Sequence, residues 1–364
     1  MLSKISLAIA ASLISVAVTT EAQERTPKAS THAYLIPHQL LPLIHAPETQ
    51  SELKLNTQQV EALEKYFREH DGTWLRARNL PADKHHQELA QLEKDFWTWA
   101  KQNLEQQQVQ RLEQLELQAQ AARMFLRADI SQKLRLTTAQ TSQLTEWALA
   151  TDLAQKNFQS ARLKGEDTSR LQEQLTKALE QEQKGPAELL TVDQRKSFPE
   201  LVGPIFNTQA LTRIYTMAPA FAADTEWINS SPLNLQSLKG KVVLVHFYAF
   251  QCHNCHANFE IYRRWHEKYR GQDVVVIGIQ SPETQTERDP AAVKKAAIER
   301  KLDFPIIIDT EMKNWNNWSN TMWPTVYVVD KRGYIRHWWQ GELNWQGATG
   351  DKVIEDVVDA ALKE

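Results

Sequence analysis

The spacing of hydrophobic and polar positions changes partway along the chain. From about residue 51 to residue 205, apolar residues recur every three or four positions among Gln, Glu, Ala and Lys, as in the stretch from Leu89 to Trp99. This spacing is typical of helices that pack one face against other helices. From residue 217 onward, short continuous apolar runs alternate with amphipathic segments and turns. That alternation indicates a sheet flanked by helices.

Four related motifs occur in the first region. They read LNTQQ from Leu55, LEQQQ from Leu104, LTTAQ from Leu136 and LTVDQ from Leu190. In three of them an Asn or Thr is followed three residues later by Gln, which is the pattern of a capping box at a helix start. The first and third motifs start 81 residues apart, and the second and fourth start 86 apart. We therefore predict an all-helical domain over 51–205 with a duplicated pair of long helices.

The second region predicts an α/β domain over residues 217–364, after a linker at 206–216. The expected strands are KVVLVHFYAF, DVVVIGIQ and PIIID, followed by two strands within WPTVYVVDKRGYIRHWWQGE. Continuous runs of β-branched and aromatic residues are typical of strands buried on both faces of a sheet. Amphipathic segments after the first two strands and near the C-terminus predict helices. The predicted fold is a central mixed sheet flanked by helices.

The only two cysteines, Cys252 and Cys255, lie between the first strand and the following helix. Their spacing suits a thiol-disulfide redox pair, continues to His256 as a C-x-x-C-H haem-attachment sequence, and places enough Cys and His together to bind a metal. A thiol at a helix start has a lowered pKa because the helix dipole stabilises the thiolate, and a protonated His253 would stabilise it further. This position favours the redox pair, with no cofactor or metal. Haem or metal handling remains an alternative.

The stretch APAFAADTEWINSSPLNLQSLKGKVVLVHFYAFQCHNCHANF, together with MWPTVYVVDKRGYIRHWWQGE, resembles thioredoxin-like proteins of the TlpA and ResA group. Within that group it is most similar to the C-terminal domain of DipZ-type proteins. The resemblance covers residues 217–364 and implies a thioredoxin fold, with Cys252 as nucleophile, Cys255 as resolving cysteine and a cis-proline at Pro324. It also implies a thiol-disulfide oxidoreductase that acts on protein thiols and disulfides and exchanges electrons with a membrane partner.

Two further candidate site residues follow from this resemblance. Thioredoxins commonly have a buried acid in the strand before the active site, and His246 occupies that position here. A buried neutral histidine can relay a proton for Cys255, or it can be a core residue hydrogen-bonded to the backbone. Glu283 matches an acidic residue near the active site of the group, although an exposed carboxylate at a strand end would look the same in sequence. Gln251 replaces the tryptophan that often precedes the first cysteine.

The N-terminal residues read MLSKISLAIAASLISVAVTTEAQ, which predicts a signal peptide over residues 1–22. The uncharged run from Ile5 to Val18 would span about 21 Å as a helix, against roughly 30 Å of membrane hydrocarbon, so we expect cleavage and no stable membrane span. Residues 23–50 are expected to be a linker. Export, as to a bacterial periplasm, would allow the cysteine pair to form a disulfide.

The LTxxQ-like motifs resemble those of small helical periplasmic proteins of the Spy and CpxP type, which are stress-related chaperones. This resemblance covers residues 51–205 and implies a chaperone-like or client-binding role as an alternative function. The net charge of −3 provides no broad attraction to nucleic acid, so no nucleic-acid partner is expected.

Overall fold

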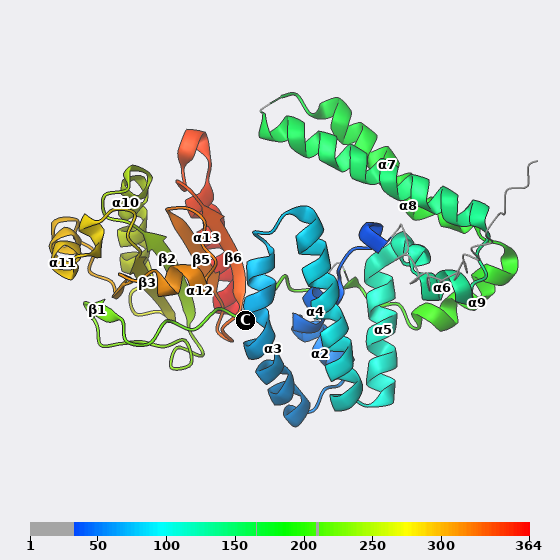
Figure 1. Cartoon of the computed structure of the whole chain (residues 1–364), viewed down its shortest axis with the longest axis horizontal. Helices are drawn as coiled ribbons and strands as arrows, with labels where there is room; N and C mark the ends of the chain where they lie inside the picture. Colours follow the sequence, from blue (N-terminus) through cyan, green and yellow to red (C-terminus); the bar gives the residue numbers. More distant parts are fainter. Residues whose placement is uncertain (1–32, 165, 209–210) are drawn as a thin grey trace, which may run out of the picture.

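The computed structural model describes residues 33–164, 166–208 and 211–364 and places a helical region beside an α/β domain (Figure 1). The predicted signal peptide and the first part of the predicted linker lie outside these residues. Of the helices in the described ranges, none is long and apolar enough to cross a membrane.

The helical region contains the same series of elements twice. After α1 (Leu40–His45), the first series is α2 (Pro47–Glu52), α3 (Thr57–Ala77), α4 (Ala82–Asn103) and α5 (Gln106–Gln120). The 3-10 helix η2 (Ala121–Leu126) leads to the second series, α6 (Ala128–Lys133), α7 (Thr138–Leu163), α8 (Ser169–Leu189) and α9 (Val192–Val202). Each series has one short helix, two long helices and a final shorter one. The repeated order supports the predicted duplication.

The four sequence motifs lie at the starts of α3, α5, α7 and α9. The side chains of Asn56, Thr137 and Thr191 each accept a hydrogen bond from the backbone N–H of the Gln three residues later. The side chain of that Gln accepts one from the backbone N–H of the Asn or Thr, which completes a capping box. At the second motif, Gln108 Oε1 accepts from the Glu105 backbone N–H at 2.9 Å. The predicted helix starts are therefore confirmed.

The glutamines of these motifs also bind one another in pairs. Gln59 and Gln108 exchange two amide hydrogen bonds, at 2.7 and 3.1 Å, and Gln140 and Gln194 do the same at 2.8 and 3.1 Å. Gln108 also donates to the Leu53 carbonyl after α2 at 3.1 Å, and Gln194 makes the equivalent bond after α6. Gln108 and Gln194 thus each join two helix starts to the turn that precedes the first of them.

The expected linker at 23–50 is wrong for its C-terminal part. Residues 40–52 form α1 and α2, and Leu40, Leu43 and Ile44 are buried. They are buried because the apolar run LLPLI packs against α3 and α4 instead of remaining in water.

The expected linker at 206–216 is also structured at its end. The Tyr215 backbone N–H donates to the Ile335 carbonyl and the Ile335 N–H donates to the Thr216 carbonyl, both at 2.9 Å. This segment therefore lies along the edge of the sheet, where its backbone pairs with strand β6.

The α/β domain contains one mixed sheet, as predicted, with six strands where the sequence predicted five; the additional strand is β1. Its strands are β1 (Glu226–Ile228), β2 (Val242–Tyr248), β3 (Val274–Gln280), β4 (Ile306–Ile308), β5 (Thr325–Val329) and β6 (Ile335–Gln340), in the spatial order β1-β4-β3-β2-β5-β6. Strands β2, β3 and β4 are parallel, and the other pairings are antiparallel. The helices are α10 (His253–Lys268), α11 (Pro290–Glu299), α12 (Lys313–Asn317) and α13 (Gly350–Lys363), with short 3-10 turns η4 (Thr286–Arg288) and η5 (Trp345–Gly347).

Alternate residues of β2 face two different apolar cores. Leu244 and Tyr248 pack with side chains of α10 and α13 on one side of the sheet. Val245 and Phe247 pack on the other side with the tryptophans of the α12 region and with Leu75 from α3. The helical region therefore completes one of the two cores.

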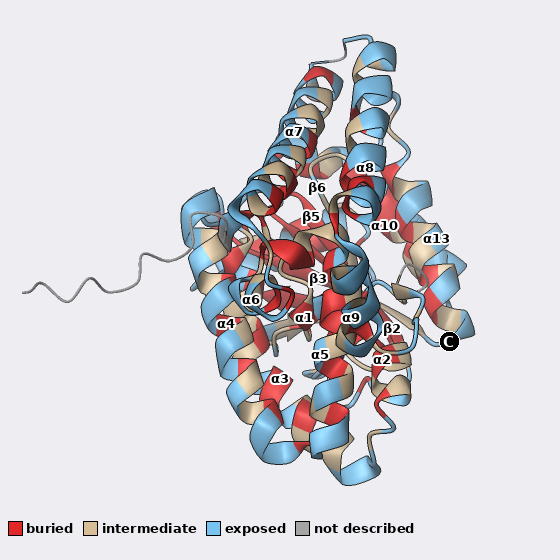
Figure 2. Ribbon diagram, turned by 90° about the vertical axis from the view of Figure 1, so that its right-hand side faces the viewer, coloured by how far each residue is buried: buried red, intermediate tan, exposed pale blue. Residues whose placement is uncertain are grey.

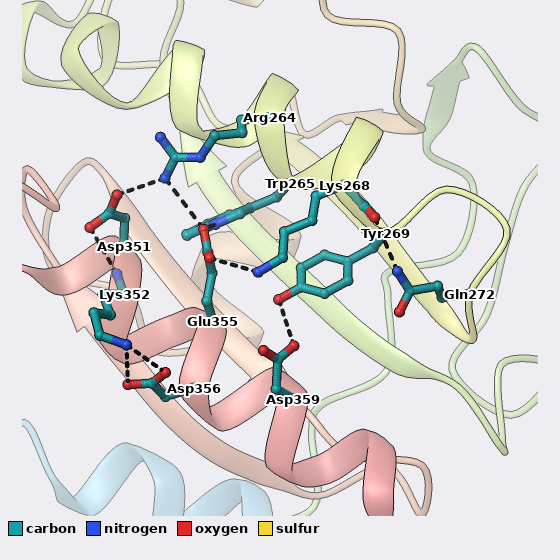
Figure 3. A network of polar contacts seen from close by, with 10 residues as sticks. All are labelled: Arg264, Trp265, Lys268, Tyr269, Gln272, Asp351, Lys352, Glu355, Asp356 and Asp359. Atoms are coloured by element: carbon teal, nitrogen blue, oxygen red, sulfur yellow. Dashed lines mark hydrogen bonds and ion pairs between the residues drawn. The ribbon is translucent and has the colours of Figure 1, made fainter.

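A polar network fastens α10 to α13 (Figure 3). Glu355 accepts hydrogen bonds from the Trp265 indole at 2.9 Å and from Lys268 Nζ at 2.7 Å. The Tyr269 hydroxyl donates to Asp359 at 3.1 Å. Because several bonds join the two helices along their length, α10 is held in a fixed position over the sheet.

A buried aspartate of the helical region, Asp71, binds both a buried histidine and the start of the α/β domain. His45 Nε2 lies 3.0 Å from Asp71 Oδ2, and both side chains are buried. The same Asp71 oxygen accepts a hydrogen bond of 2.6 Å from the Met217 backbone N–H. Asp71 therefore links α1, α3 and the first residues of the α/β domain.

The paired glutamines give a stability prediction. Gln108→Ala should leave the Gln59 amide and the Leu53 carbonyl short of partners and lower the free energy of unfolding of the helical region by about 1–3 kcal/mol. Gln107→Ala, at the exposed neighbouring position, should change it by less than about 0.5 kcal/mol. Urea unfolding followed by far-UV circular dichroism measures both, and equal effects would contradict the proposed importance of the pair.

Candidate redox site

The two cysteines lie where β2 ends and α10 begins. Cys252 is the N-cap residue of α10, and its backbone N–H donates to the Ala249 carbonyl at 3.2 Å. The Cys255 N–H donates to the Cys252 carbonyl at 3.1 Å, which places the second cysteine in the first turn of the helix. Both are free thiols in this structure; Cys252 is 9% exposed and Cys255 is 0% exposed. The predicted strand-to-helix setting is confirmed.

The two thiols differ strongly in acidity. The pKa of Cys252 is lowered, mainly by a side-chain hydrogen bond from Cys255, with further hydrogen bonds from the backbone at the helix start. Burial raises the pKa of Cys255 far above its ordinary value, and the neighbouring Cys252 sulfur raises it further. Of the two sulfur atoms, Cys252 is therefore the one that carries a negative charge more readily.

Pro324 lies at the same edge of the sheet as the cysteines. The Trp323–Pro324 peptide bond is cis, as the family resemblance implied. In the antiparallel pairing of β5 with β2, Thr325 is opposite Phe247, so Pro324 lies at the end of β2 from which the chain leads to Cys252.

The Trp323 side chain, next to Pro324, packs near the cysteines. Its indole N–H donates to the Ser281 carbonyl at 3.0 Å, and the ring packs against the apolar cluster that contains both cysteines. Trp315 and Trp318 are buried in the core on the other side of the sheet. Of the three tryptophans in the stretch NWNNWSNTMW, Trp323 is thus the one that contacts the cysteine cluster.

A buried carboxylate that the sequence did not predict lies beside the cysteine loop. Glu287 is 0% exposed and accepts hydrogen bonds from the backbone N–H groups of Gln251, Glu283 and Thr284, at 2.6, 2.8 and 2.9 Å. It therefore holds the residue before Cys252 against the loop that follows β3. Charged residues crowd the sequence ETQTERDP, and no feature of that sequence distinguishes the buried glutamate from the exposed one.

Glu283 and His253 are both exposed at the site. The negative charge of the Glu283 carboxylate disfavours both thiolates. It partly opposes the lowering of the Cys252 pKa and adds to the raising of the Cys255 pKa. His253 lies between the cysteines in the first turn of α10. His256, the histidine of the C-x-x-C-H sequence, has its Nε2 atom 2.8 Å from the Phe250 carbonyl oxygen.

His246 is fully enclosed in the core, on the α10 side of the sheet. Its ring lies 3.9 Å from the Tyr262 ring between centroids, and neither ring nitrogen has a hydrogen-bond partner within the described part of the chain. The alternative of a histidine bonded to backbone is therefore wrong. Burial lowers the pKa of His246 to about 3, so the ring is neutral at physiological pH; a role in proton transfer stays a prediction.

A hollow of about 450 Å³ opens beside the cysteine loop. Its lining includes Phe250, Gln251 and His256 from the loop and first turn of α10, and Lys295 and Arg300 from the region of α11. Among the described residues, including those at the cysteine loop, no three His, Cys, Asp or Glu side chains are grouped so as to hold a metal ion.

The α/β domain is similar to known thioredoxin-like proteins. Residues 214–338 match the model of the AhpC/TSA family. Over 123 residues the chain is 36% identical to Protein DipZ of Mycobacterium bovis, an alignment that covers 33% of this chain and 18% of that protein. The chain thus spans less than a fifth of DipZ.

Shorter relatives match over most of their length. The thiol-disulfide oxidoreductase YkuV of Bacillus subtilis is 27% identical over 146 residues, which are 40% of this chain and 94% of YkuV. The crystal structure of a thiol-disulfide isomerase from Corynebacterium glutamicum is 26% identical, covers 40% of this chain and 97% of its own, and has a TM-score of 0.34. The C-terminal segment of the chain is thus similar to the thioredoxin-like AhpC/TSA family, as the family match and the relatives DipZ and YkuV show.

Proposed function

We propose that the protein is an exported thiol-disulfide oxidoreductase that uses the Cys252-His253-Asn254-Cys255 pair on protein substrates. The observation that carries the proposal is the arrangement of the two thiols: Cys252 is the N-cap residue at the start of α10, where its pKa is lowered, and the fully buried Cys255 lies one turn later. The sequence of residues 1–22 supports export.

The reaction proceeds through a mixed disulfide. The Cys252 thiolate attacks one sulfur of a substrate disulfide, that S–S bond breaks, and the departing thiolate takes up a proton. Cys255 then loses its proton and attacks the Cys252 sulfur, which releases the second substrate thiol and leaves a Cys252–Cys255 disulfide. The substrate gains two electrons and the pair loses two. In reverse, the oxidised pair oxidises a substrate dithiol, and a membrane-bound dithiol or disulfide protein is the partner we propose for resetting the pair.

The role of each cysteine can be tested with serine variants. Cys252→Ser should abolish the protein's catalysis of insulin disulfide reduction, measured with dithiothreitol as the electron donor. The one remaining cysteine, Cys255, is fully buried and cannot take its place. Cys255→Ser should also lose turnover but accumulate a mixed disulfide with the substrate, visible by non-reducing electrophoresis. Turnover that survives in Cys252→Ser, with folding checked by circular dichroism, would refute the mechanism.

The electrostatics of Cys252 predict opposite shifts in its reaction with iodoacetamide, which requires the thiolate. In the wild type, alkylation of Cys252 should be half-maximal below the free-thiol value of about pH 8.5. Cys255→Ala removes the hydrogen-bond donor and should move this midpoint to higher pH. Glu283→Gln removes a negative charge that raises the pKa of Cys252 and should move it to lower pH.

Alkylation rates measured across the pH range provide this test. Glu180→Gln, at an exposed position of α8, is the control with the same charge change and should leave the midpoint unaltered. A midpoint that falls in Cys255→Ala would show that the buried thiol does not stabilise the Cys252 thiolate.

A second candidate function is the binding of unfolded polypeptides by the helical region. The observation that favours it is an apolar cavity of about 550 Å³ between α5, η2, α8 and α9. Its lining includes Leu117, Phe125 and Phe198, and at its mouth Ile205 is 84% exposed. Exposed apolar surface of this kind is stabilised by contact with apolar side chains of a partner.

Helices α7 and α8 add to this surface. They project from the rest of the molecule as a hairpin with a largely exposed surface (Figure 2). Leu149 and Leu153 are among the large apolar side chains that α7 exposes to solvent.

Two exposed isoleucines allow a matched test of this second function. Ile205→Asp places a charge at the mouth of the cavity and should reduce suppression of the aggregation of a heat-unfolded reporter enzyme, measured by light scattering. Ile298→Asp, on α11 and 78% exposed, should leave suppression unchanged. The effect should persist when both cysteines are serine; suppression that depends on the cysteines instead would assign it to thiol chemistry.

A further inference from the structure

An arginine at the end of α3 reaches from the helical region to the α/β domain. Arg78 Nη2 donates to the carbonyl oxygens of Trp318 and Ser319, at 2.9 and 3.1 Å. It also donates to the Tyr327 hydroxyl oxygen at 2.7 Å. The guanidinium group lies over the rings of Tyr327 and Trp338, 5.4 and 5.2 Å from their centroids.

The loop that Arg78 contacts, residues 318–324, needs partners from outside itself. Backbone N–H groups of the loop bind the last carbonyl groups of the short helix α12, whereas the Trp318 and Ser319 carbonyl groups of the loop itself accept hydrogen bonds from side chains outside it. Ser319 has a φ of 51°, in the left-handed region that costs energy for a residue with a side chain. Arg78, together with Asn79 Nδ2 at 2.7 Å from the Ser319 carbonyl oxygen, supplies those partners from the other domain.

The same loop ends at the redox site. The Tyr327 hydroxyl, which accepts from Arg78, donates to Asn320 Oδ1 in the middle of the loop at 2.6 Å. At the end of the loop, Trp323 packs against the cluster that contains both cysteines, and Pro324 follows. Arg78 therefore binds the start of a loop whose other end carries Trp323 and Pro324 at the redox site.

We propose that Arg78 is a positioning residue for the redox site. It fixes the start of the 318–324 loop, so that Trp323 and Pro324 form the surface against which a substrate polypeptide places its disulfide. The inference rests on the proposed thiol-disulfide exchange. Through Arg78, the helical region would position the surface that faces the substrate, although Arg78 contacts neither sulfur atom.

Arg78→Ala tests the proposal, with Arg76→Ala as the matched control. Arg76 is exposed on the same helix and donates to Thr73 on that helix, so the control removes an equal charge without touching the loop. Arg78→Ala should raise KM for a polypeptide disulfide about tenfold, the effect of losing one or two hydrogen bonds to a charged group. The kcat and the pH midpoint of Cys252 alkylation should stay at their wild-type values, because the sulfur environment is intact.

Tyr327→Phe provides a second variant that removes the hydroxyl joining Arg78 to Asn320. If the two residues act through one contact, the double variant should have the KM of Arg78→Ala alone. An unchanged KM in Arg78→Ala, an equal rise in Arg76→Ala, or additive effects of the two changes would each overturn the proposal.

Hydrogen exchange separates this inference from the proposed function. Amides of residues 319–323 should exchange faster in Arg78→Ala than in the wild type, and at the wild-type rate in Arg76→Ala. If the wild type has no exchange activity on disulfides, the proposed function fails, while faster amide exchange still supports the hold of Arg78 on the loop. Unchanged amide exchange in Arg78→Ala overturns the positioning role whatever the activity.

Discussion

The placement of two thiols at the start of α10 is the constraint on which the proposed chemistry depends. It requires Cys252 to cap the helix and Cys255 to lie one turn deeper, in a core that raises the pKa of its own thiol. The rest of the domain maintains this geometry. Strand β2 is buried on both faces, and α10 is tied to α13 by the Glu355 bonds. Because both cysteines belong to the start of α10, a helix free to slide would move both thiols relative to Trp323 and Pro324.

Local sequence patterns were sufficient to predict most of the α/β fold. Long apolar runs and the amphipathic stretch after the cysteines produce the strands and helix that they predict, because burial on a sheet follows directly from those patterns. Contacts between distant segments could not be predicted. The exposed Glu283 and the buried Glu287 differ only in the path of the loop that carries them, and Arg78 reaches a loop 240 residues away. The apolar run at 40–44 is too short to show a helical period, so the sequence predicts a linker where the structure has α1.

The LTxxQ-like motifs show the same division between local and distant information. Capping of the helix start by Asn or Thr is a local interaction, and the sequence predicts it correctly. The bond from Gln59 to Gln108, or from Gln140 to Gln194, joins residues 49 or 54 positions apart. The motif therefore has two functions, and only the first can be recognised from five consecutive letters. The second explains why Gln, with both a donor and an acceptor, occupies the last position.

The segment at 215–217 affects how the sheet meets other chains. By pairing with Ile335, it covers part of the outer side of β6, while the opposite edge is the three-residue strand β1. Unpaired edge strands invite pairing with the backbone of another molecule, and short or covered edges prevent it. A protein that handles unfolded chains, as proposed here, meets many such backbones. With one edge covered and the other only three residues long, the sheet is protected from pairing with the backbone of a client chain.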